Sequence, residues 1–298
     1  MGEKHFWSKA LERSEQARSC GALVPLSTST IEFSGPSAEQ FELRQLNAAL
    51  PKHHRPEGPK PNPFRPWDAQ LEIERIYHSH VLILNKYPVQ CGHMLLITQG
   101  WASQINWLQP DDWRALVRVD RDSTGLWFFN SGPRAGASQP HRHLQLLPRH
   151  PGERICPRLS WFTDRLQMPA ATTDNGQITD PLVKSCVIAQ RPQSRNPDVE
   201  ADLLHDLYRS LAKRLGLGDQ STHQPPAVPY NLLLTEKWMA LIKRSQDQDK
   251  GFSVNALGFA GYLLATQRSD LTWLQNHGGE QLLRQVVPDL SGFTDAVN

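Results

Sequence analysis

The chain has 298 residues, with 32 Lys and Arg against 30 Asp and Glu and a formal net charge of +2. A chain of this length can bury a substantial core in one large domain or about two smaller ones. The balanced charge excludes a protein that coats nucleic acid non-specifically.

Signals for export or membrane insertion are missing from the sequence. The longest apolar stretches, 81–84 and 232–234, fall far short of the roughly 20 residues that cross a bilayer. The first residues lack the apolar segment of a signal peptide. The cysteines form no CxxC pair and are expected to be reduced thiols: Cys20, Cys91, Cys156 and Cys186. We therefore predict a cytoplasmic protein that binds neither membranes nor nucleic acid.

The N-terminal half predicts a helix, a loop and several strands. Apolar residues at helical spacing predict an amphipathic helix over 4–18. Six prolines and one glycine make 51–66 an extended basic loop, because they exclude a helix or a central strand. A strand, a turn and a second strand are predicted over 76–98, followed by two short helical patterns over 103–118.

The remaining elements mix strands and helices. Short strands are predicted over 126–129 and 141–147, with a glycine-rich turn between them. A helix over 202–215, a hairpin over 230–243 and a helical region from Ser269 complete the chain. The predicted fold class is therefore α+β, with a largely antiparallel sheet flanked by helices.

One segment concentrates residues suited to catalysis. In the predicted strand over 141–147, a period of two places His141, His143 and Gln145 on one face. Before the strand, Gly136, Ala137 and Ser138 have small side chains that let an anion approach the backbone closely. A phosphate-binding turn beside a row of histidines suggests phosphoryl or nucleotidyl transfer.

Three interpretations of the two histidines stay open at this point. The polar face of the strand could simply meet solvent. The pair could bind a metal ion, with His93 or His150 as a third ligand. A neutral imidazole could also attack phosphorus and carry the transferred group covalently, and the glycine turn favours this last interpretation.

The pattern His-x-His-x-Gln resembles the signature of the transferase branch of the histidine-triad superfamily. Within that branch the chain resembles the diadenosine tetraphosphate phosphorylases, also called ATP adenylyltransferases. The similar blocks occur in the same order over about residues 55–265: 60–64, 82–98, 130–147, 230–235 and 255–261. The resemblance implies a single HIT-like domain over 1–298, in which 1–185 are catalytic and 186–298 complete the nucleotide site.

The resemblance also implies roles for individual residues. His143 matches the nucleophile that becomes adenylylated, His141 orients it, and Gln145 replaces the third histidine of the hydrolases. The positions that match contacts to nucleotide or phosphate are Lys60, Asn85, Lys86, Asn130, Gly136, Ala137, Ser138, Asn255, Gly258, Phe259 and Gly261. No residue matches a metal ligand.

The implied reaction is reversible phosphorolysis of diadenosine tetraphosphate to ATP and ADP. Its expected partners are the dinucleotide, ATP, ADP and phosphate, with no tightly bound cofactor and Mg²⁺ entering at most with the nucleotide. The oligomeric state does not follow from these features. Two alternatives are a hexose-1-phosphate uridylyltransferase, whose signature has proline where this chain has Arg142, and a non-catalytic dinucleotide sensor.

Overall fold

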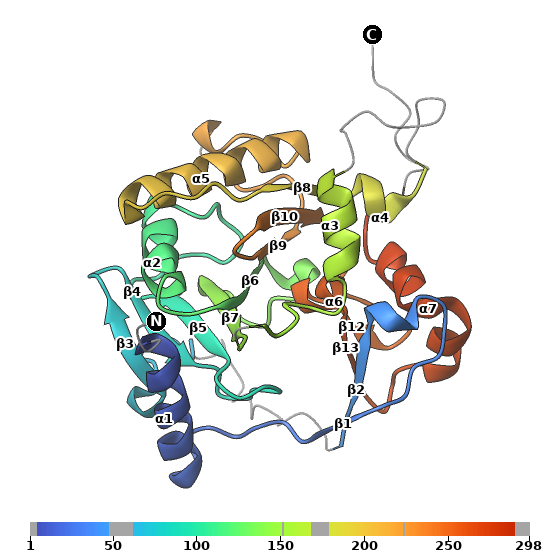
Figure 1. Cartoon of the computed structure of the whole chain (residues 1–298), viewed down its shortest axis with the longest axis horizontal. Helices are drawn as coiled ribbons and strands as arrows, with labels where there is room; N and C mark the ends of the chain where they lie inside the picture. The colour runs from blue at the N-terminus through green and yellow to red at the C-terminus, as the bar shows by residue number, and fades with distance from the viewer. Residues whose placement is uncertain (1–4, 48–61, 151, 168–178, 223, 290–298) are drawn as a thin grey trace.

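A computed structural model describes residues 5–47, 62–150, 152–167, 179–222 and 224–289. Its main feature is an eight-stranded sheet in the order β3-β4-β5-β7-β6-β9-β10-β8 (Figure 1). The strands of this sheet are β3 (Glu72–Ile76), β4 (His80–Leu84), β5 (Met94–Thr98), β6 (Gly125–Asn130), β7 (His143–Pro148), β8 (Cys186–Gln190), β9 (Tyr230–Leu234) and β10 (Trp238–Lys243).

All neighbouring strands of the main sheet are antiparallel. A second sheet has the order β1-β2-β13, in which β13 runs parallel to β2. The smaller strands are β1 (Thr28–Thr30), β2 (Glu42–Leu46), β11 (Gln248–Asp249), β12 (Phe252–Ser253) and β13 (Tyr262–Ala265). The predicted α+β class with a largely antiparallel sheet is confirmed.

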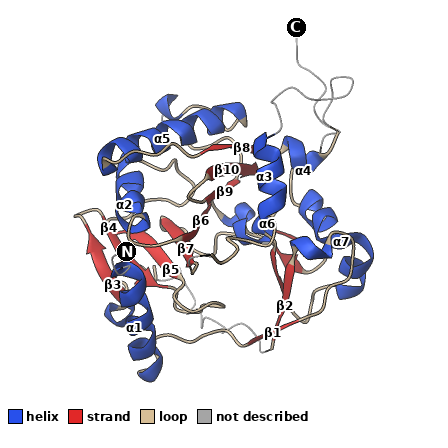
Figure 2. Ribbon diagram, viewed as in Figure 1, coloured by secondary structure: helices blue, strands red, loops and turns tan. Residues whose placement is uncertain are grey.

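Helices cover both faces of the main sheet (Figure 2). One core joins the sheet to α1, α2 and α5, and the other joins it to α3, α4, α6 and α7. The helices are α1 (His5–Ser19), α2 (Pro110–Asp120), α3 (Leu159–Gln167), α4 (Pro181–Lys184), α5 (Pro197–Arg214), α6 (Ala256–Ala260) and α7 (Leu271–Gln285). Along β6, Trp127 and Phe129 enter the first core and Leu126 and Phe128 the second, as the period of two requires.

Helix starts follow from local sequence. Pro110 opens α2, and Asp111 and Asp112 lie in its first turn, where carboxylates favour the helix dipole. Asn196 caps α5 by accepting hydrogen bonds from the backbone of residues 198 and 199. Asp270 caps α7 in the same manner.

Two predicted elements differ from the structure. Residues 103–109 are irregular rather than helical, because Ser103 pairs with His141 in an isolated β-bridge. For the same reason the strand predicted over 141–147 begins later in the structure: β7 starts at His143, and His141 lies in the segment before it. Most of the proline-rich loop 51–66, including Lys60, lies outside the described residues.

None of the helices in the described parts of the chain combines the length and apolarity needed to span a bilayer. The four cysteines are free thiols. The division of the chain at residue 185 remains a prediction, and the main sheet contains strands from both sides of it.

Candidate active site

His143 begins β7, which lies between β5 and β6 in the main sheet. The buried side-chain amide of Gln104 is hydrogen-bonded to both the backbone N–H and the backbone oxygen of His143. Gln104 Oε1 accepts from His143 N at 2.8 Å, and Gln104 Nε2 donates to His143 O at 3.2 Å and to Asn130 O at 2.7 Å. Gln104 therefore fixes the position of His143 against the neighbouring strand.

The His143 ring is held in one tautomer. Its Nδ1–H donates to the backbone oxygen of His141 at 2.7 Å. Burial lowers the pKa of His143 to about 4, so the ring is neutral near pH 7. Nε2 then carries a lone pair, and it has no hydrogen-bond partner among the described residues. A neutral imidazole held in this way can act as a nucleophile.

The His141 ring uses both of its nitrogens within the protein. Asn62 Nδ2 donates to Nδ1 at 2.7 Å, and Nε2–H donates to Thr98 O at 2.8 Å. Burial lowers the pKa of His141, and the charges of Arg65 and Arg142 add to this effect. His141 thus positions His143 through its carbonyl, while its ring is fixed by its neighbours.

A second row of polar side chains holds Gln145. Asn85 Nδ2 donates to His93 Nδ1 at 3.1 Å, and His93 Nε2–H donates to Gln145 Oε1 at 3.1 Å. Burial lowers the pKa of His93 to about 4, which keeps the ring neutral. Because Oε1 is engaged, the Gln145 amide nitrogen is the group that can donate to a substrate oxygen.

The geometry argues against a metal ion on the two histidines. Both ring nitrogens of His141 have protein partners, and His93 is bonded to two amides. His150, the other suggested ligand, packs against Trp7 with ring centroids 4.5 Å apart. Within the described ranges there is no cluster of three or more His, Cys, Asp or Glu residues able to hold a metal ion.

The glycine turn is ordered by its own backbone. Gly136 adopts φ +87°, and its N–H donates to Pro133 O at 2.8 Å, while Ala137 N–H donates to Gly132 O at 3.0 Å. Both amides therefore close the turn in this structure, and the phosphate contacts that the resemblance implies for Gly136 and Ala137 remain a prediction. Ser138 is exposed, and its N–H and hydroxyl remain the turn's available donors.

Asn130 supports this turn. Its Oδ1 accepts from Asn231 Nδ2 at 2.8 Å and from Ala256 N at 2.9 Å. Asn231 also donates to Ala135 O and accepts from buried Arg244. Asn130 is only 1% exposed, so the structure gives it a supporting role, and its predicted phosphate contact remains a prediction.

The C-terminal segment contributes its first residue to the site and the others to the core. Asn255 caps α6 and lies against Gly136, where an added Cβ would come within 2.7 Å of the Asn255 Cβ. Gly258, Phe259 and Gly261 are buried, and Arg244 lies over the Phe259 ring. All three residues pack in the core of this structure, and the nucleotide contacts that the resemblance implies for them remain a prediction.

Lys86 follows β4 next to Asn85 and is exposed. It is therefore available to a ligand beside the Asn85–His93–Gln145 row. Lys60, the other predicted cation, falls outside the described residues.

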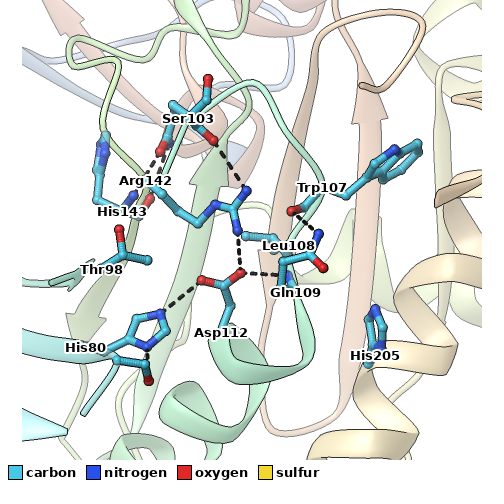
Figure 3. Close-up of polar contacts among 12 residues, drawn as sticks. His80, Thr98, Ser103, Trp107, Leu108, Gln109, Asp112, Arg142, His143 and His205 are labelled. Atoms are coloured by element: carbon cyan, nitrogen blue, oxygen red, sulfur yellow. Dashed lines mark hydrogen bonds and ion pairs between the residues drawn. The ribbon is translucent and has the colours of Figure 1, made fainter. Parts of the chain in front are cut away.

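Arg142, between the two histidines, points to the opposite side of the chain and joins a buried ionic network (Figure 3). Its Nη1 lies 3.0 Å from Asp112 Oδ2, and His80 Nε2 lies 2.9 Å from Asp112 Oδ1. Asp112 Oδ2 also accepts from Gln109 N at 2.6 Å. Burial would raise the pKa of Asp112, but the hydrogen bond from His80 and the charge of Arg142 bring it below its ordinary value. The network ties the histidine segment to the start of α2.

Three residues of the site were not singled out from the sequence. Asn62 and Phe64 belong to a block that resembles the family, yet only Lys60 was selected from it. Phe64 packs on the rings of His141 and His143 at centroid distances of 5.7 and 5.5 Å. Gln104 lies in an irregular segment, and no spacing in the sequence connects it to His143.

Two protein-family models match this chain. Residues 1–157 match the Ap4A phosphorylase N-terminal domain, and residues 182–288 match the ATP adenylyltransferase C-terminal domain. The chain is 28% identical over 230 residues to diadenosine 5',5'''-P1,P4-tetraphosphate phosphorylase 2 of Saccharomyces cerevisiae, covering 70% of each protein. It is 30% identical over 203 residues to Protein APA1 of the same yeast, covering 62% of this chain and 61% of that protein.

Solved structures show the same fold. The crystal structure of yeast Ap4A phosphorylase Apa2 in complex with AMP has a TM-score of 0.73 at 25% identity, covering 98% of this chain and all of that one. The complex of Apa2 with Ap4A has a TM-score of 0.72 at 23% identity, covering 96% and 98%. These matches do not favour the uridylyltransferase or sensor alternatives. Because the family model of the Ap4A phosphorylase N-terminal domain matches more than half of the residues of this chain, the chain belongs to the Ap4A phosphorylase family.

Proposed function

We propose that this protein phosphorolyses diadenosine tetraphosphate to ATP and ADP, reversibly, through an adenylyl group on His143. The observation that carries the proposal is the hydrogen bond of 2.7 Å from His143 Nδ1–H to His141 O, which leaves Nε2 unprotonated. Membership of the Ap4A phosphorylase family supports the substrate.

The reaction has two displacement steps at one phosphorus atom. In the first, His143 Nε2 forms a bond to the α-phosphorus while the bond to the leaving ATP oxygen breaks. In the second, a phosphate oxygen forms a bond to that phosphorus while the nitrogen–phosphorus bond breaks, which releases ADP. The leaving group of the first step is the ATP anion, and that of the second is the neutral His143 imidazole, which keeps its Nδ1 proton. Neither step therefore needs a general acid from the protein.

Stabilising the transition state requires donors on the non-bridging oxygens. The Gln145 amide nitrogen and the N–H and hydroxyl of Ser138 are suited to this role. Lys86 supplies positive charge at the nucleotide.

Replacing Gln145 by His is expected to add hydrolysis to the reaction. An imidazole can accept a proton from water, whereas the amide cannot, and general-base catalysis contributes roughly 10²–10⁴-fold. We expect AMP release without phosphate to rise at least about tenfold above the parent enzyme, measured by chromatography of the nucleotides. The control Gln145→Ala should lose phosphorolysis without gaining hydrolysis. A Gln145→His variant that stays strictly dependent on phosphate would contradict this role.

The pH dependence of the first step should follow His143. Because burial lowers the pKa of His143 to about 4, the nucleophile stays unprotonated down to about that pH. An enzyme whose nucleophile was a histidine of ordinary pKa would instead lose activity as the pH falls through about 6.5. Single-turnover adenylylation without added phosphate should therefore be independent of this group between pH 5 and 8. A midpoint near 6.5 would contradict the assignment.

The lowered pKa values of His93 and His143 also limit the pH range in which the protein stays folded. Folded His93 and His143 bind protons more weakly than their unfolded forms. The unfolded state therefore gains protons first, and the protein loses stability as pH falls from about 6.5 towards 4. Circular dichroism at each pH separates this loss of structure from protonation of the nucleophile.

Several further features belong to the same proposal. The protein would work without a tightly bound cofactor, with Mg²⁺ entering only with the nucleotide. ADP and phosphate would be its other small-molecule partners, and neither nucleic acid nor membranes would be bound. A cytoplasmic location is supported by four unpaired cysteines.

Incubation of the protein with diadenosine tetraphosphate tests the function directly. With phosphate, ATP and ADP should form in equal amounts. Without phosphate, intact mass should show one adenylyl group, which peptide mapping should place on His143. Binding without cleavage under both conditions would contradict the proposed function.

A further inference from the structure

The chain that carries the two histidines changes its neighbour at His143. The register of β6 with β7 ends at the pair Phe128 and Gln145, while β5 stays on the other side of β7. Residues 140–142 instead lie beside the irregular segment 102–104, with two backbone hydrogen bonds of 2.8 Å between the two segments. β6 and β7 therefore form a fork that opens at His143.

The side chain of Gln104 fills this fork. Asn130, at the end of β6, would face His143 if the register of the two strands continued. The amide of Gln104 lies between them instead. Its Oε1 accepts from His143 N at 2.8 Å, and its Nε2 donates to Asn130 O at 2.7 Å and to His143 O at 3.2 Å. The amide thus joins the two strands where their own ladder has ended.

Only an amide of this length has the required donors and acceptor. Oε1 accepts one hydrogen bond, and each of the two hydrogens on Nε2 is donated to a carbonyl oxygen. Gln104 is 1% exposed, so bulk water cannot replace these hydrogen bonds. A glutamate could not donate to the two carbonyls when ionised, an asparagine is one methylene shorter, and a methionine keeps the length without any polar hydrogen.

Beyond the fork the two strands lead to different parts of the site. β6 continues into the turn that carries Ser138, and this branch follows β9, since Ser131 N donates to Tyr230 O at 3.0 Å. The other branch carries His143, whose ring is oriented by His141 O. The width of the fork therefore sets how far His143 Nε2 lies from a phosphate bound at Ser138.

We propose that Gln104 is a positioning residue for the nucleophile: its side-chain amide holds the fork between β6 and β7 at one width and thereby aligns His143 Nε2 with the phosphorus atom that it attacks. This inference rests on the proposed function. Gln104 touches neither the substrate nor the reacting atoms, so it acts on the chemical steps and not on nucleotide binding. Both displacement steps use the same Nε2, and both depend on the fork.

Replacing Gln104 by Met tests this role by separating kcat from KM. A displacement of about 1 Å at a reacting group costs roughly 10²-fold in rate, so we expect kcat for phosphorolysis to fall by about 10²-fold. KM for the dinucleotide should stay within about threefold. Single-turnover adenylylation without phosphate and exchange of labelled phosphate into ADP should fall by the same factor, because both pass through His143.

Replacing Gln104 by Glu tests the need for a hydrogen donor within one protein. When ionised, the carboxylate faces two carbonyl oxygens, and the fork loses both donated hydrogen bonds. When protonated, the carboxyl keeps an acceptor for His143 N and regains one donor. Burial raises the pKa of such a carboxyl. The rate of adenylylation should therefore rise at least about tenfold as the pH falls from 8 to 5.5, whereas the parent and Gln104→Met stay flat.

The groups around position 104 do not produce this pH dependence themselves. The titratable or charged side chains on the segment that packs against Gln104 are His141, Arg142 and His143, and neither β6 nor 101–109 contains any. Burial lowers the pKa values of both histidines, so the rings stay neutral over this range, and Arg142 keeps its charge. Circular dichroism at each pH confirms that the variant is folded.

Gln90→Met is the matched control at the other end of β7. Gln90 Nε2 donates to Pro148 O at 2.9 Å, and its Oε1 accepts from Arg149 Nη1 at 2.7 Å. This variant also removes hydrogen bonds between a side-chain amide and the end of β7, but far from the fork. Its kcat should stay within about twofold of the parent, whatever its change in thermal melting.

The outcomes separate the two proposals. An unchanged kcat in folded Gln104→Met, a rise in KM alone, or an equal loss of kcat in Gln90→Met would overturn the positioning role. A Gln104→Glu variant whose rate does not rise at low pH would overturn it as well, and this comparison stands even where Gln104→Met does not fold. A parent enzyme that neither cleaves the dinucleotide nor exchanges phosphate into ADP would overturn the proposed function itself.

Discussion

Replacing His143 by Ala is expected to lower phosphorolysis by at least about 10⁴-fold, because both displacement steps of the proposed reaction pass through its Nε2. No neighbouring group can substitute. The His141 ring is bonded at both nitrogens, and His93 is bonded to Asn85 and Gln145. Chromatography of the nucleotides measures the loss, and intact mass should show no adenylyl group.

The variant should still fold and bind nucleotide. The backbone of residue 143 keeps its contacts with Gln104. The hydrogen bonds that join Asn85, His93 and Gln145 do not involve the ring of His143. His205→Ala is a suitable control, because His205 lies on α5, outside the catalytic segment, and pairs with Gln220. Phosphorolysis at the parent rate by a folded His143→Ala protein would eliminate the covalent mechanism.

The catalytic face of β7 could be predicted from sequence, since it depends on a local period of two. Leu144 and Leu146 enter one core, while His143 and Gln145 meet the site on the other side. The Gln145 contact with His93 was not predictable in the same way, because it joins residues 52 positions apart.

Contacts made by the backbone could not be predicted from the sequence. The glycine turn has the composition of a phosphate-binding loop, but its hydrogen bonds to Gly132 and Pro133 depend on the conformation that the chain adopts. The block 255–261 similarly resembles a ligand-binding segment. Its glycines are required for packing, since a Cβ at Gly261 would lie 2.4 Å from Gln40 O.

Side chains that only support the site were also missed. Gln104 and Asn62 hold the histidines from segments without regular structure, where no hydrophobic period reveals orientation. Arg142 could be read only as the residue between two histidines, and its partner Asp112 only as a helix-start carboxylate. Their pairing depends on the packing of α2 against the sheet.

This pairing makes Asp112 the residue whose loss should cost most stability. Asp112 is 1% exposed and binds Arg142, His80 and Gln109 N. In Asp112→Ala the buried guanidinium of Arg142 has no counter-charge, and the start of α2 loses a hydrogen bond. We expect the free energy of unfolding to fall by about 3–5 kcal/mol, measured by urea denaturation.

The adjacent residue provides the control. Asp111 lies in the same turn of α2 but is exposed and pairs with Arg114 at the surface, so Asp111→Ala should cost less than about 1 kcal/mol. Removing Arg142 as well, in Asp112→Leu with Arg142→Met, should cost less than the sum of the single changes, because no buried charge is left unpaired. If the two single losses simply add, the ionic pair does not couple β7 to α2, and the packing of α2 alone must hold the histidine segment in place.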